Sequence, residues 1–314
     1  MNKQNILSSQ KCGETTRSNF DRQKALTLIA DLKSLVKLPV LIANVLPVFT
    51  GFWLALYFSN VSFLEYFDMF LLTIIGSTLV MAGALVLNNW YDVDIDSIMA
   101  RTKKRPTVTG NIPLRVVLII GIILSLLGFM LLLFTTVEAT IYAFIGWFTY
   151  VFLYTMWSKR KYTLNTVIGS VSGAVTPLIG WTAIASSFHT VPIILFSILF
   201  IWQMPHTFAI AMRKYEEYKA AGVAMLPVVH GFKITKRQMV VYVACLLPLP
   251  IYLVDLGTPF IVIATMLNLI WLGICIIGLF MRDDEKYAYI NFLYSVNYIT
   301  IIFLLMILMT LFRN

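Results

Sequence analysis

The chain has 314 residues, of which 59% are hydrophobic and only 12% are charged. Soluble domains have about 25% charged residues, so the composition excludes an ordinary soluble protein and favours a polytopic helical membrane protein. The formal net charge of +9 does not by itself indicate a nucleic-acid partner, and we expect none, because Lys and Arg in a membrane protein first report its orientation. The cysteines Cys12, Cys245 and Cys275 show no CxxC spacing, so they predict neither a disulfide framework nor a zinc site.

Residues 1–33 are polar, mixed in charge and without an apolar core, so they predict a polar cytoplasmic tail rather than a cleavable signal peptide. Nine apolar runs follow, each close to the roughly 20 residues that a helix needs to cross a membrane. None alternates with the period of two that a β-barrel requires. We therefore predict a single transmembrane domain over residues 34–314, an all-α membrane bundle of nine helices. The apolar runs cover approximately 38–58, 69–87, 114–134, 139–157, 164–185, 191–212, 239–255, 259–280 and 288–312.

The basic residues orient these helices. If the N-terminus is cytoplasmic, all but one of the 24 Lys and Arg lie on the inner side, and only Arg313 lies outside. Such a bias is the positive-inside pattern. The inner loops after the second and sixth helices are also long and rich in charged residues. We expect a multi-pass protein of the cell membrane with a cytoplasmic N-terminus, an external C-terminus and a polar site that faces the cytoplasm.

The second helix ends in NNWYDVDID, residues 88–96. Asn88, Asp92 and Asp96 are four residues apart and would share one face of a continuing helix, whereas Asp94 would point to the opposite side. Stacked carboxylates repel each other, and burial at the edge of the hydrocarbon adds to that cost. One amide and two carboxylates suit Mg²⁺ shared with a substrate phosphate. The alternative is an interfacial loop whose acids face water.

Basic residues near this motif are suited to phosphate oxygens that a metal leaves free. Arg101 and Arg105 belong to the basic run 101–105 directly downstream. Lys159 and Arg160, between the fourth and fifth helices, supply further cations. The positive-inside rule also explains these residues, so both interpretations stay open.

The inner loop after the sixth helix has a second acidic pair, Glu216 and Glu217, shortly after Arg213. Adjacent residues do not share a helix face, so only one of the two glutamates would point inward. Two acidic clusters on the same side could hold two Mg²⁺ ions facing one diphosphate. A solvated helix end is the other interpretation of this pair.

His206 lies at the inner end of the sixth helix, beside Pro205. An ionisable residue within a membrane segment favours a functional role. The competing interpretation is a structural histidine bonded to backbone freed by Pro205. In the fifth helix, Gly169 and Gly173 predict close helix packing, and Pro177 would bend the helix and leave a carbonyl free near a cavity.

These motifs resemble the UbiA superfamily of intramembrane prenyltransferases, over about residues 33–312. The pattern NxxxDxxxD is specific to the superfamily, and WQMPH with the MLP ending resembles its haem-modifying branch. One departure is the second aspartate motif, of DxxxD type in the wider superfamily, where this chain has Glu216–Glu217–Tyr218. The resemblance is carried by NNWYDVDID at 88–96, RTKKRP at 101–106, YTMWSKR at 154–160, NTVIGSVSGAVTPLIGW at 165–181, WQMPHTFAIA at 202–211 and EEYKAAGVAMLP at 216–227.

The resemblance implies a UbiA-type bundle whose cofactor is Mg²⁺ and whose substrates are farnesyl diphosphate and haem B. The farnesyl group would join a vinyl group of haem B, with water added, to give haem O and diphosphate. Haem A synthase would be a candidate partner. The implied catalytic residues are Asp92 and Asp96, with Asn88, Asp92, Asp96 and Glu217 as metal ligands, and with Arg101, Arg105, Lys159, Arg160 and Arg213 on the diphosphate.

The resemblance also gives His206 a candidate role. Neutral imidazole is a common ligand of haem iron, so this side chain would help to position haem B by iron ligation or by a hydrogen bond.

Two alternatives remain. A prenyltransferase of the same superfamily that acts on a quinone precursor would keep the first aspartate motif but should lack WQMPH. A cation-coupled transporter would need acidic residues near the middle of the bilayer, whereas here they lie at the inner ends of helices.

Overall fold

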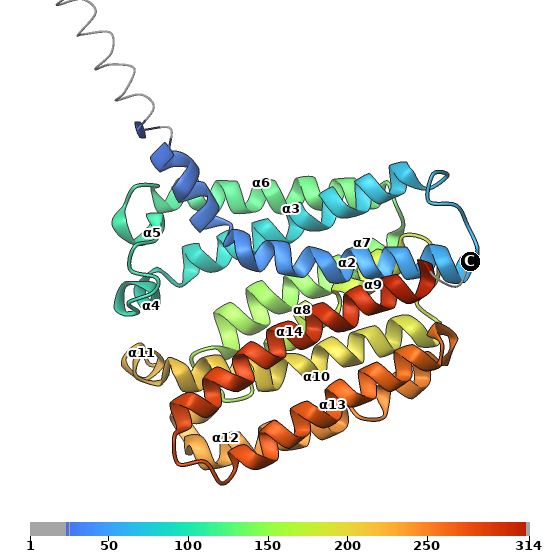
Figure 1. Ribbon diagram of the computed structural model, residues 1–314. Helices are drawn as coiled ribbons and strands as arrows, with labels where there is room; N and C mark the ends of the chain where they lie inside the picture. Colours follow the sequence, from blue (N-terminus) through green and yellow to red (C-terminus); the bar gives the residue numbers. More distant parts are fainter. Residues whose placement is uncertain (1–22, 25, 312–314) are drawn as a thin grey trace, which may run out of the picture.

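The computed structural model describes residues 23–24 and 26–311, and every regular element in these ranges is helical (Figure 1). Of the predicted tail, residues 23–24 and 26–33 are described and helical, and the rest lies outside the described residues. The elements are α2 Leu38–Ser59, α3 Phe67–Tyr91, α4 Val93–Ile98, α5 Pro106–Thr109, α6 Leu114–Leu133, α7 Val137–Phe148, η1 Thr149–Ser158, α8 Asn165–Ala174, α9 Thr176–Thr182, α10 Thr190–Arg213, α11 Tyr215–Ala220, α12 Leu226–Cys245, η2 Leu249–Leu256, α13 Thr258–Gly278 and α14 Asp284–Leu311.

Eight helical stretches within the described residues are long and apolar enough to cross a membrane. The remaining predicted crossing, 164–185, is divided into α8 and α9. Pro177 has no N–H to donate to the carbonyl of Gly173, and the Thr176 hydroxyl donates to this carbonyl instead, at 2.7 Å. The all-α membrane bundle is therefore confirmed, with its fifth crossing built from two short helices. The carbonyl expected to be free near the cavity is not free.

The helix α12 begins at Leu226, well before the apolar run predicted from 239. Pro227 stands in its first turn, where a missing N–H costs nothing. The segment before 239 contains Lys233, Lys236 and Arg237, so hydropathy does not detect it. The helix is kinked at Gly231, whose φ of 78° only glycine adopts easily.

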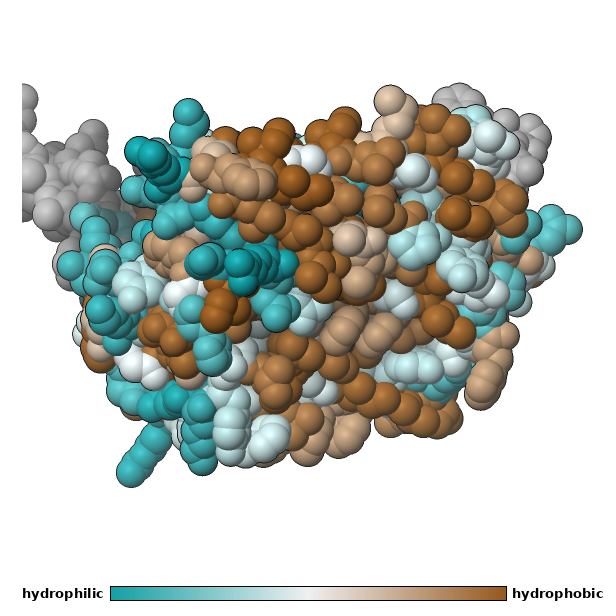
Figure 2. Space-filling model, turned by 90° about the horizontal axis from the view of Figure 1, so that it is seen from below, coloured by the Kyte–Doolittle hydropathy of each residue, from teal (hydrophilic) through white to brown (hydrophobic). Residues whose placement is uncertain are grey.

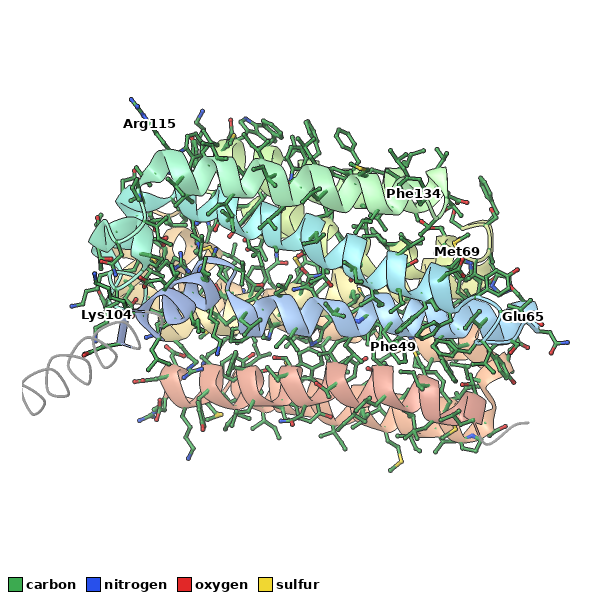
Figure 3. The ribbon with its side chains drawn as sticks, turned by 90° about the horizontal axis from the view of Figure 1, so that it is seen from above. Phe49, Glu65, Met69, Lys104, Arg115 and Phe134 are labelled. Carbon is green, nitrogen blue, oxygen red and sulfur yellow. The ribbon has the colours of Figure 1, made fainter. Side chains whose placement is uncertain are left out.

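The two ends of the bundle differ in polarity. The short helices α4, α5 and α11 lie at one end, which we call the loop end, and the C-terminal end of α14 lies at the other (Figure 1). Lys104 and Arg115 lie at the loop end, whereas Glu65, Met69 and Phe134 lie at the opposite end (Figure 3). Hydrophobic surface covers the middle of the molecule and hydrophilic residues gather at the loop end (Figure 2). The chain is a multi-pass membrane protein with its long charged loops on one side.

Among the described glycines, those that bring two helix backbones closest together lie between α2 and α9. A Cβ atom on Gly51 would lie 2.0 Å from the carbonyl oxygen of Pro177, and one on Gly180 would lie 1.9 Å from that of Val48. Small residues permit such an approach between membrane helices. This contact holds the broken crossing against α2.

Gly169 and Gly173 of α8, predicted to allow close packing against neighbouring helices, do so by making room for side chains of η1 and α10. A Cβ at Gly169 would lie 2.8 Å from the ring of Tyr154, and a Cβ at Gly173 would lie 2.5 Å from the amide nitrogen of Gln203. Both side chains belong to the wall of the central cavity described below.

Candidate active site

The predicted acidic face forms at the junction of α3 and α4. α3 ends just before Asp92 and α4 begins just after it, yet the helical spacing continues. The Asp92 N–H donates to the Asn88 carbonyl at 2.9 Å, and the Asp96 N–H donates to the Asp92 carbonyl at 2.8 Å. Asn88, Asp92 and Asp96 are buried, whereas Asp94 is exposed. Asn88 Nδ2 donates to Asp92 Oδ2 at 2.7 Å, so these side chains form one buried cluster.

Basic side chains from two other segments neutralise this cluster. Arg105, the residue before α5, forms an ion pair with Asp96, and Lys159, the residue after η1, forms one with Asp92. Charges taken out of water need such partners, because an unpaired buried carboxylate is strongly unfavourable. Two of the residues predicted to bind the diphosphate therefore lie directly on the acidic face.

Arg160 lies at the edge of the same cluster. Its guanidinium donates two bonds of 2.7 Å to Asp94 and lies 3.9 Å from Asp92 Oδ1. The bound guanidinium lowers the pKa of the Asp94 carboxyl. It also lies over the ring of Tyr91, 5.4 Å from the ring centre. Asp94, which is not part of the acidic face, thus holds Arg160 near that face.

Sequence reasoning missed Lys37, which joins the cluster from the start of α2. Its ammonium donates to Asn88 Oδ1, and its backbone adopts the left-handed conformation, with φ 49° and ψ 53°. Loss of hydration lowers its pKa well below the ordinary value, and the charges of Arg105 and Lys159 act in the same direction. In the sequence, Lys37 is marked only by its position directly before the first apolar run. The positive-inside rule explains a Lys at that position without any role in the site.

The segment η1 is π-helical, with bonds such as that from the Lys159 N–H to the Tyr154 carbonyl, five residues back, at 3.0 Å. π-Helical turns are rare and are frequent at functional sites. Here they bring successive turns to face α3 and the cavity. Tyr150 and Tyr154 line the cavity, and the Thr155 hydroxyl accepts a bond of 2.9 Å from the amide of Asn88.

The two glutamates of α11 face different ways. Glu216 is exposed, whereas Glu217 Oε1 accepts a bond of 2.9 Å from Lys214. The other oxygen, Oε2, is buried and has no hydrogen-bond partner among the described residues. The Lys214 ammonium, and after it the charge of Arg101, holds the pKa of Glu217 below its usual value. Arg101 therefore lies near Glu217, and one glutamate of the pair faces inward as the spacing predicted.

An apolar cluster brings these two loops together. Ile95 and Met99 of the first loop pack against Ala211, Val223 and Met225 around the second. Burial of such side chains is favourable in proportion to the apolar area removed from water. The contact explains why acidic residues far apart in the sequence lie at the same end of the bundle.

Arg213 lies away from this cluster. Its guanidinium carbon is 5.1 Å from the ring centre of Tyr289 and 4.9 Å from that of Phe292, both on α14. These contacts are cation–π interactions at an exposed position. In this conformation Arg213 is not grouped with the cations of the acidic face, so the geometry does not support its predicted diphosphate role.

His206 faces α14 and is not part of the cavity wall as the described residues form it. Its Nδ1 shares a hydrogen bond of 2.8 Å with the Ser295 hydroxyl, and its ring stacks on Trp202 at 4.6 Å. The geometry is that of a structural histidine, although its partner is Ser295 rather than backbone freed by Pro205. The haem-positioning role stays a prediction.

A cavity of about 270 Å³ lies beside the acidic cluster and is lined by α2, α3, α7, η1, α8, α9 and α10. Tyr154 connects the two, because it lines the cavity while the Lys159 ammonium lies 5.9 Å from its ring centre. Much of the wall is apolar or small, as at Leu85, Val80 and Ile179. An apolar chamber beside a group of cations and carboxylates suits a ligand with an apolar chain and a charged head.

The acidic face has the donor set that Mg²⁺ prefers, namely carboxylate and amide oxygens. Asp92 Oδ1 and Glu217 Oε2 are both buried, and neither has a hydrogen-bond partner among the described residues. No three His, Cys, Asp or Glu side chains in the described ranges form a metal site by themselves. A cation bound here would therefore complete its coordination with water or a substrate phosphate, and with the Asn88 amide oxygen in place of its bond from Lys37; the residues present fit that role.

Comparison with known proteins agrees with this geometry. Residues 44–297 match the UbiA prenyltransferase family. The protein named protoheme IX farnesyltransferase from Oceanobacillus iheyensis is 53% identical over 312 residues, which is 99% of each chain. A solved structure concerned with digeranylgeranylglyceryl phosphate synthase has a TM-score of 0.72 at 21% identity, over 90% of this chain and 98% of that one. A UbiA homolog from Archaeoglobus fulgidus bound to GPP and Mg²⁺ has a TM-score of 0.66 at 16% identity, over 87% of this chain and 99% of that one. The two structures share the fold, and the family match and the sequence identity establish that this chain belongs to the UbiA prenyltransferase family.

Proposed function

We propose that the chain transfers the farnesyl group of farnesyl diphosphate to a vinyl group of haem B, with addition of water, to give haem O and diphosphate. The observation that carries the proposal is the buried face of Asn88, Asp92 and Asp96 beside an apolar cavity. The acceptor is suggested by the name of the relative from O. iheyensis, which is similar to this chain over 99% of its length. A quinone precursor as acceptor is not favoured, because the WQMPH segment is present.

In this proposal the carboxylates act through charge and position rather than as nucleophiles. Asp92 and Asp96 are the catalytic residues and, with the Asn88 amide oxygen, would hold Mg²⁺, while Glu217 on α11 would be a ligand of a second ion. Bound Mg²⁺ stabilises the negative charge that develops on the leaving diphosphate. The A. fulgidus homolog bound to GPP and Mg²⁺ supports this dependence.

In the proposed complex, the basic side chains would bind the diphosphate in place of the carboxylates. Arg105 and Lys159 neutralise Asp96 and Asp92 in this structure, and they would bind diphosphate oxygens when a cation holds the carboxylates instead. Arg160 lies 3.9 Å from Asp92 Oδ1, and Arg101 lies near Glu217. Preorganised cations in a site shielded from water stabilise a leaving group strongly, because their orientation needs little reorganisation.

We further propose that the loop end faces the cytoplasm of a cell-membrane protein, with the N-terminus inside and the C-terminus outside. The distribution of Lys and Arg supports this orientation. The substrates and the site would then meet at the cytoplasmic surface of the bilayer. Haem A synthase as a partner stays a prediction, which co-purification of the two proteins from one membrane would test.

The decisive experiment is to incubate the purified full chain in detergent or lipid with haem B, farnesyl diphosphate and Mg²⁺, and to identify the products by mass spectrometry. We expect haem O and diphosphate, and no product when a chelator removes Mg²⁺. A farnesylated quinone precursor with no farnesylated haem would overturn the choice of acceptor. Turnover that is unaffected by the chelator would overturn the role of the metal.

A further inference from the structure

Two polar side chains of α10 line the cavity at a distance from the carboxylates. Gln203 and Thr207 are one helical turn apart, and both belong to the cavity wall. Gln203 Nε2 donates to the carbonyl of Ser170 at 3.3 Å, and the carbonyl oxygen Oε1 has no partner among the described residues. The Thr207 hydroxyl makes no hydrogen bond within the described residues, whereas the Ser170 hydroxyl on the adjacent helix α8 donates to the Thr166 carbonyl at 2.7 Å.

An apolar prenyl chain does not require these groups. A Thr in a membrane helix commonly satisfies its hydroxyl on the carbonyl of the preceding turn, and polar groups without partners are unfavourable within a membrane protein. The fold nevertheless makes room for the Gln203 amide, because a Cβ at Gly173 would lie 2.5 Å from its Nε2 atom. Together, Gln203 Oε1 and the Thr207 hydroxyl present two open hydrogen-bonding positions on one side of the cavity.

Gln203 and Thr207 also lie deeper in the bundle than the proposed diphosphate site at the loop end. Thr207 and Gln203 lie roughly 9 and 15 Å along α10 from its end at Arg213, at 1.5 Å per residue. The Tyr154 ring adjoins both the Lys159 ammonium, at 5.9 Å, and Gly169 of α8 in the cavity wall, where a Cβ would lie 2.8 Å from the ring. A group bound by Gln203 and Thr207 would face the prenyl and acceptor carbons rather than the phosphates.

The proposed reaction needs such a position. The C1–O bond of farnesyl diphosphate breaks, and diphosphate leaves with the electron pair. The vinyl electron pair of haem B then forms the new bond to C1, which leaves a cation on the vinyl carbon attached to the porphyrin. This cation either accepts the oxygen lone pair of water, whose proton passes to the released diphosphate, or loses a proton from the adjacent carbon to give an alkene. Haem O forms only by the first route.

We propose that Gln203 and Thr207 bind the water molecule that adds to this cation. Gln203 Oε1 accepts a hydrogen bond from this water, and the Thr207 hydroxyl holds its second position, so the oxygen lone pair faces the cavity. Both residues are positioning residues, since they act on the reaction through the water. The inference rests on the proposed function, which it deepens by assigning the step that decides between hydroxylated and dehydrated product.

The test is the ratio of dehydrated to hydroxylated farnesyl haem, measured by mass spectrometry for the full chain with haem B, farnesyl diphosphate and Mg²⁺. Thr207→Val keeps the shape of the side chain, Gln203→Leu keeps an apolar side chain of comparable volume, and each removes the hydrogen-bonding groups. We expect the ratio to rise on the order of tenfold in each, the factor for loss of one hydrogen bond. Thr207→Ser retains the hydroxyl and should restore the wild-type ratio. The matched control is Thr78→Val on α3, outside the cavity wall, whose hydroxyl donates to the Ile74 carbonyl at 2.6 Å.

The outcomes separate the two proposals. A wild-type chain that forms no farnesylated haem contradicts the proposed function itself. A wild-type chain that forms haem O, with Thr207→Val and Gln203→Leu variants that form it in the same ratio, overturns the water site alone. A merely structural role would lower total turnover without changing the ratio. If one variant fails to fold, the ratio in the other decides, because each residue supplies a separate hydrogen bond.

Discussion

At the scale of single residues, the role of each carboxylate at the α3–α4 junction depends on the helix face that it occupies. Asp92 and Asp96 are 1% and 3% exposed, whereas the side chain of Asp94 is 60% exposed. All three carry the same functional group within five positions of the sequence. Their difference in burial therefore predicts a difference in function.

Asp92→Asn and Asp96→Asn should each lower turnover by at least about 100-fold, because each removes a charged oxygen donor from the proposed Mg²⁺ site. Asp94→Asn loses only an exposed pair with Arg160, so it should cost less than about fivefold, or about 1 kcal/mol. Haem O formation at saturating Mg²⁺ measures the effect, and size-exclusion chromatography checks folding. Equal losses at positions 94 and 96 would contradict the assignment of the buried face.

Lys37 is the residue whose importance follows only from its contacts. Lys37→Met removes a cation from Asn88 and the acidic cluster, so we expect the KM for farnesyl diphosphate to rise on the order of tenfold, as for loss of one charge-assisted hydrogen bond. The matched control is Lys33→Met, which removes an equal charge from an exposed position one turn earlier. Steady-state kinetics of both variants provide the measurement. An equal rise in both would mean that only the general surface charge matters.

At the scale of elements, the site depends on irregular helices. The π-helical turns of η1 bring Thr155 to Asn88 and Lys159 to Asp92, which a regular α-helix of the same residues would not do in the same register. The break at Pro177 gives α9 a separate contact with α2. Both irregularities adjoin the cavity, so the elements that deviate from regular geometry are those that shape it.

Gly180→Ala tests the contact between α2 and α9. The new Cβ would lie 1.9 Å from a backbone oxygen and 2.8 Å from a backbone nitrogen, so the helices must separate. We expect a loss of about 1–3 kcal/mol in stability, as for overpacking of a core. Gly273→Ala is the matched control, because a Cβ there meets nothing within 4 Å, and Ala in a helix gains about 0.5–1 kcal/mol over Gly. Thermal unfolding of both variants in detergent measures the difference, and similar midpoints would show that the two helices can move apart easily.

At the scale of the whole molecule, the two ends of the bundle have different chemistry. The loop end holds α4, α5 and α11 with the acidic cluster and its cations, and the opposite end holds the short connections (Figure 1). This polarity predicts both the orientation in the membrane and the side from which charged substrates enter. It can be tested without any assay of activity.

Single cysteines at positions 104 and 65, in a chain with Cys12, Cys245 and Cys275 replaced, should report that orientation. Lys104 lies at the loop end and Glu65 at the opposite end (Figure 3). A thiol reagent that cannot cross membranes should label Glu65→Cys in intact cells and Lys104→Cys only after the membrane is opened. Labelling of Lys104→Cys from outside would reverse the proposed topology.

The sequence by itself determined the class of the protein, the positions of most membrane crossings and the shared face of Asn88, Asp92 and Asp96. These features are local: a crossing requires an apolar run of a set length, and residues four apart share a helix face whatever surrounds them. The family followed as well, because the motifs that carry it are continuous in the sequence.

Only the tertiary structure decided which basic groups meet the face of Asn88, Asp92 and Asp96. Lys37, Arg105 and Lys159 come from three separate segments, whereas Arg213, of equal charge, lies over aromatic rings of α14. Every basic residue of the loop end obeys the positive-inside rule, so charge and position in the sequence could not separate them. The separation depends on how distant helices pack, at contacts such as those of Gly51 and Gly180, and packing between distant segments leaves no local pattern in the chain.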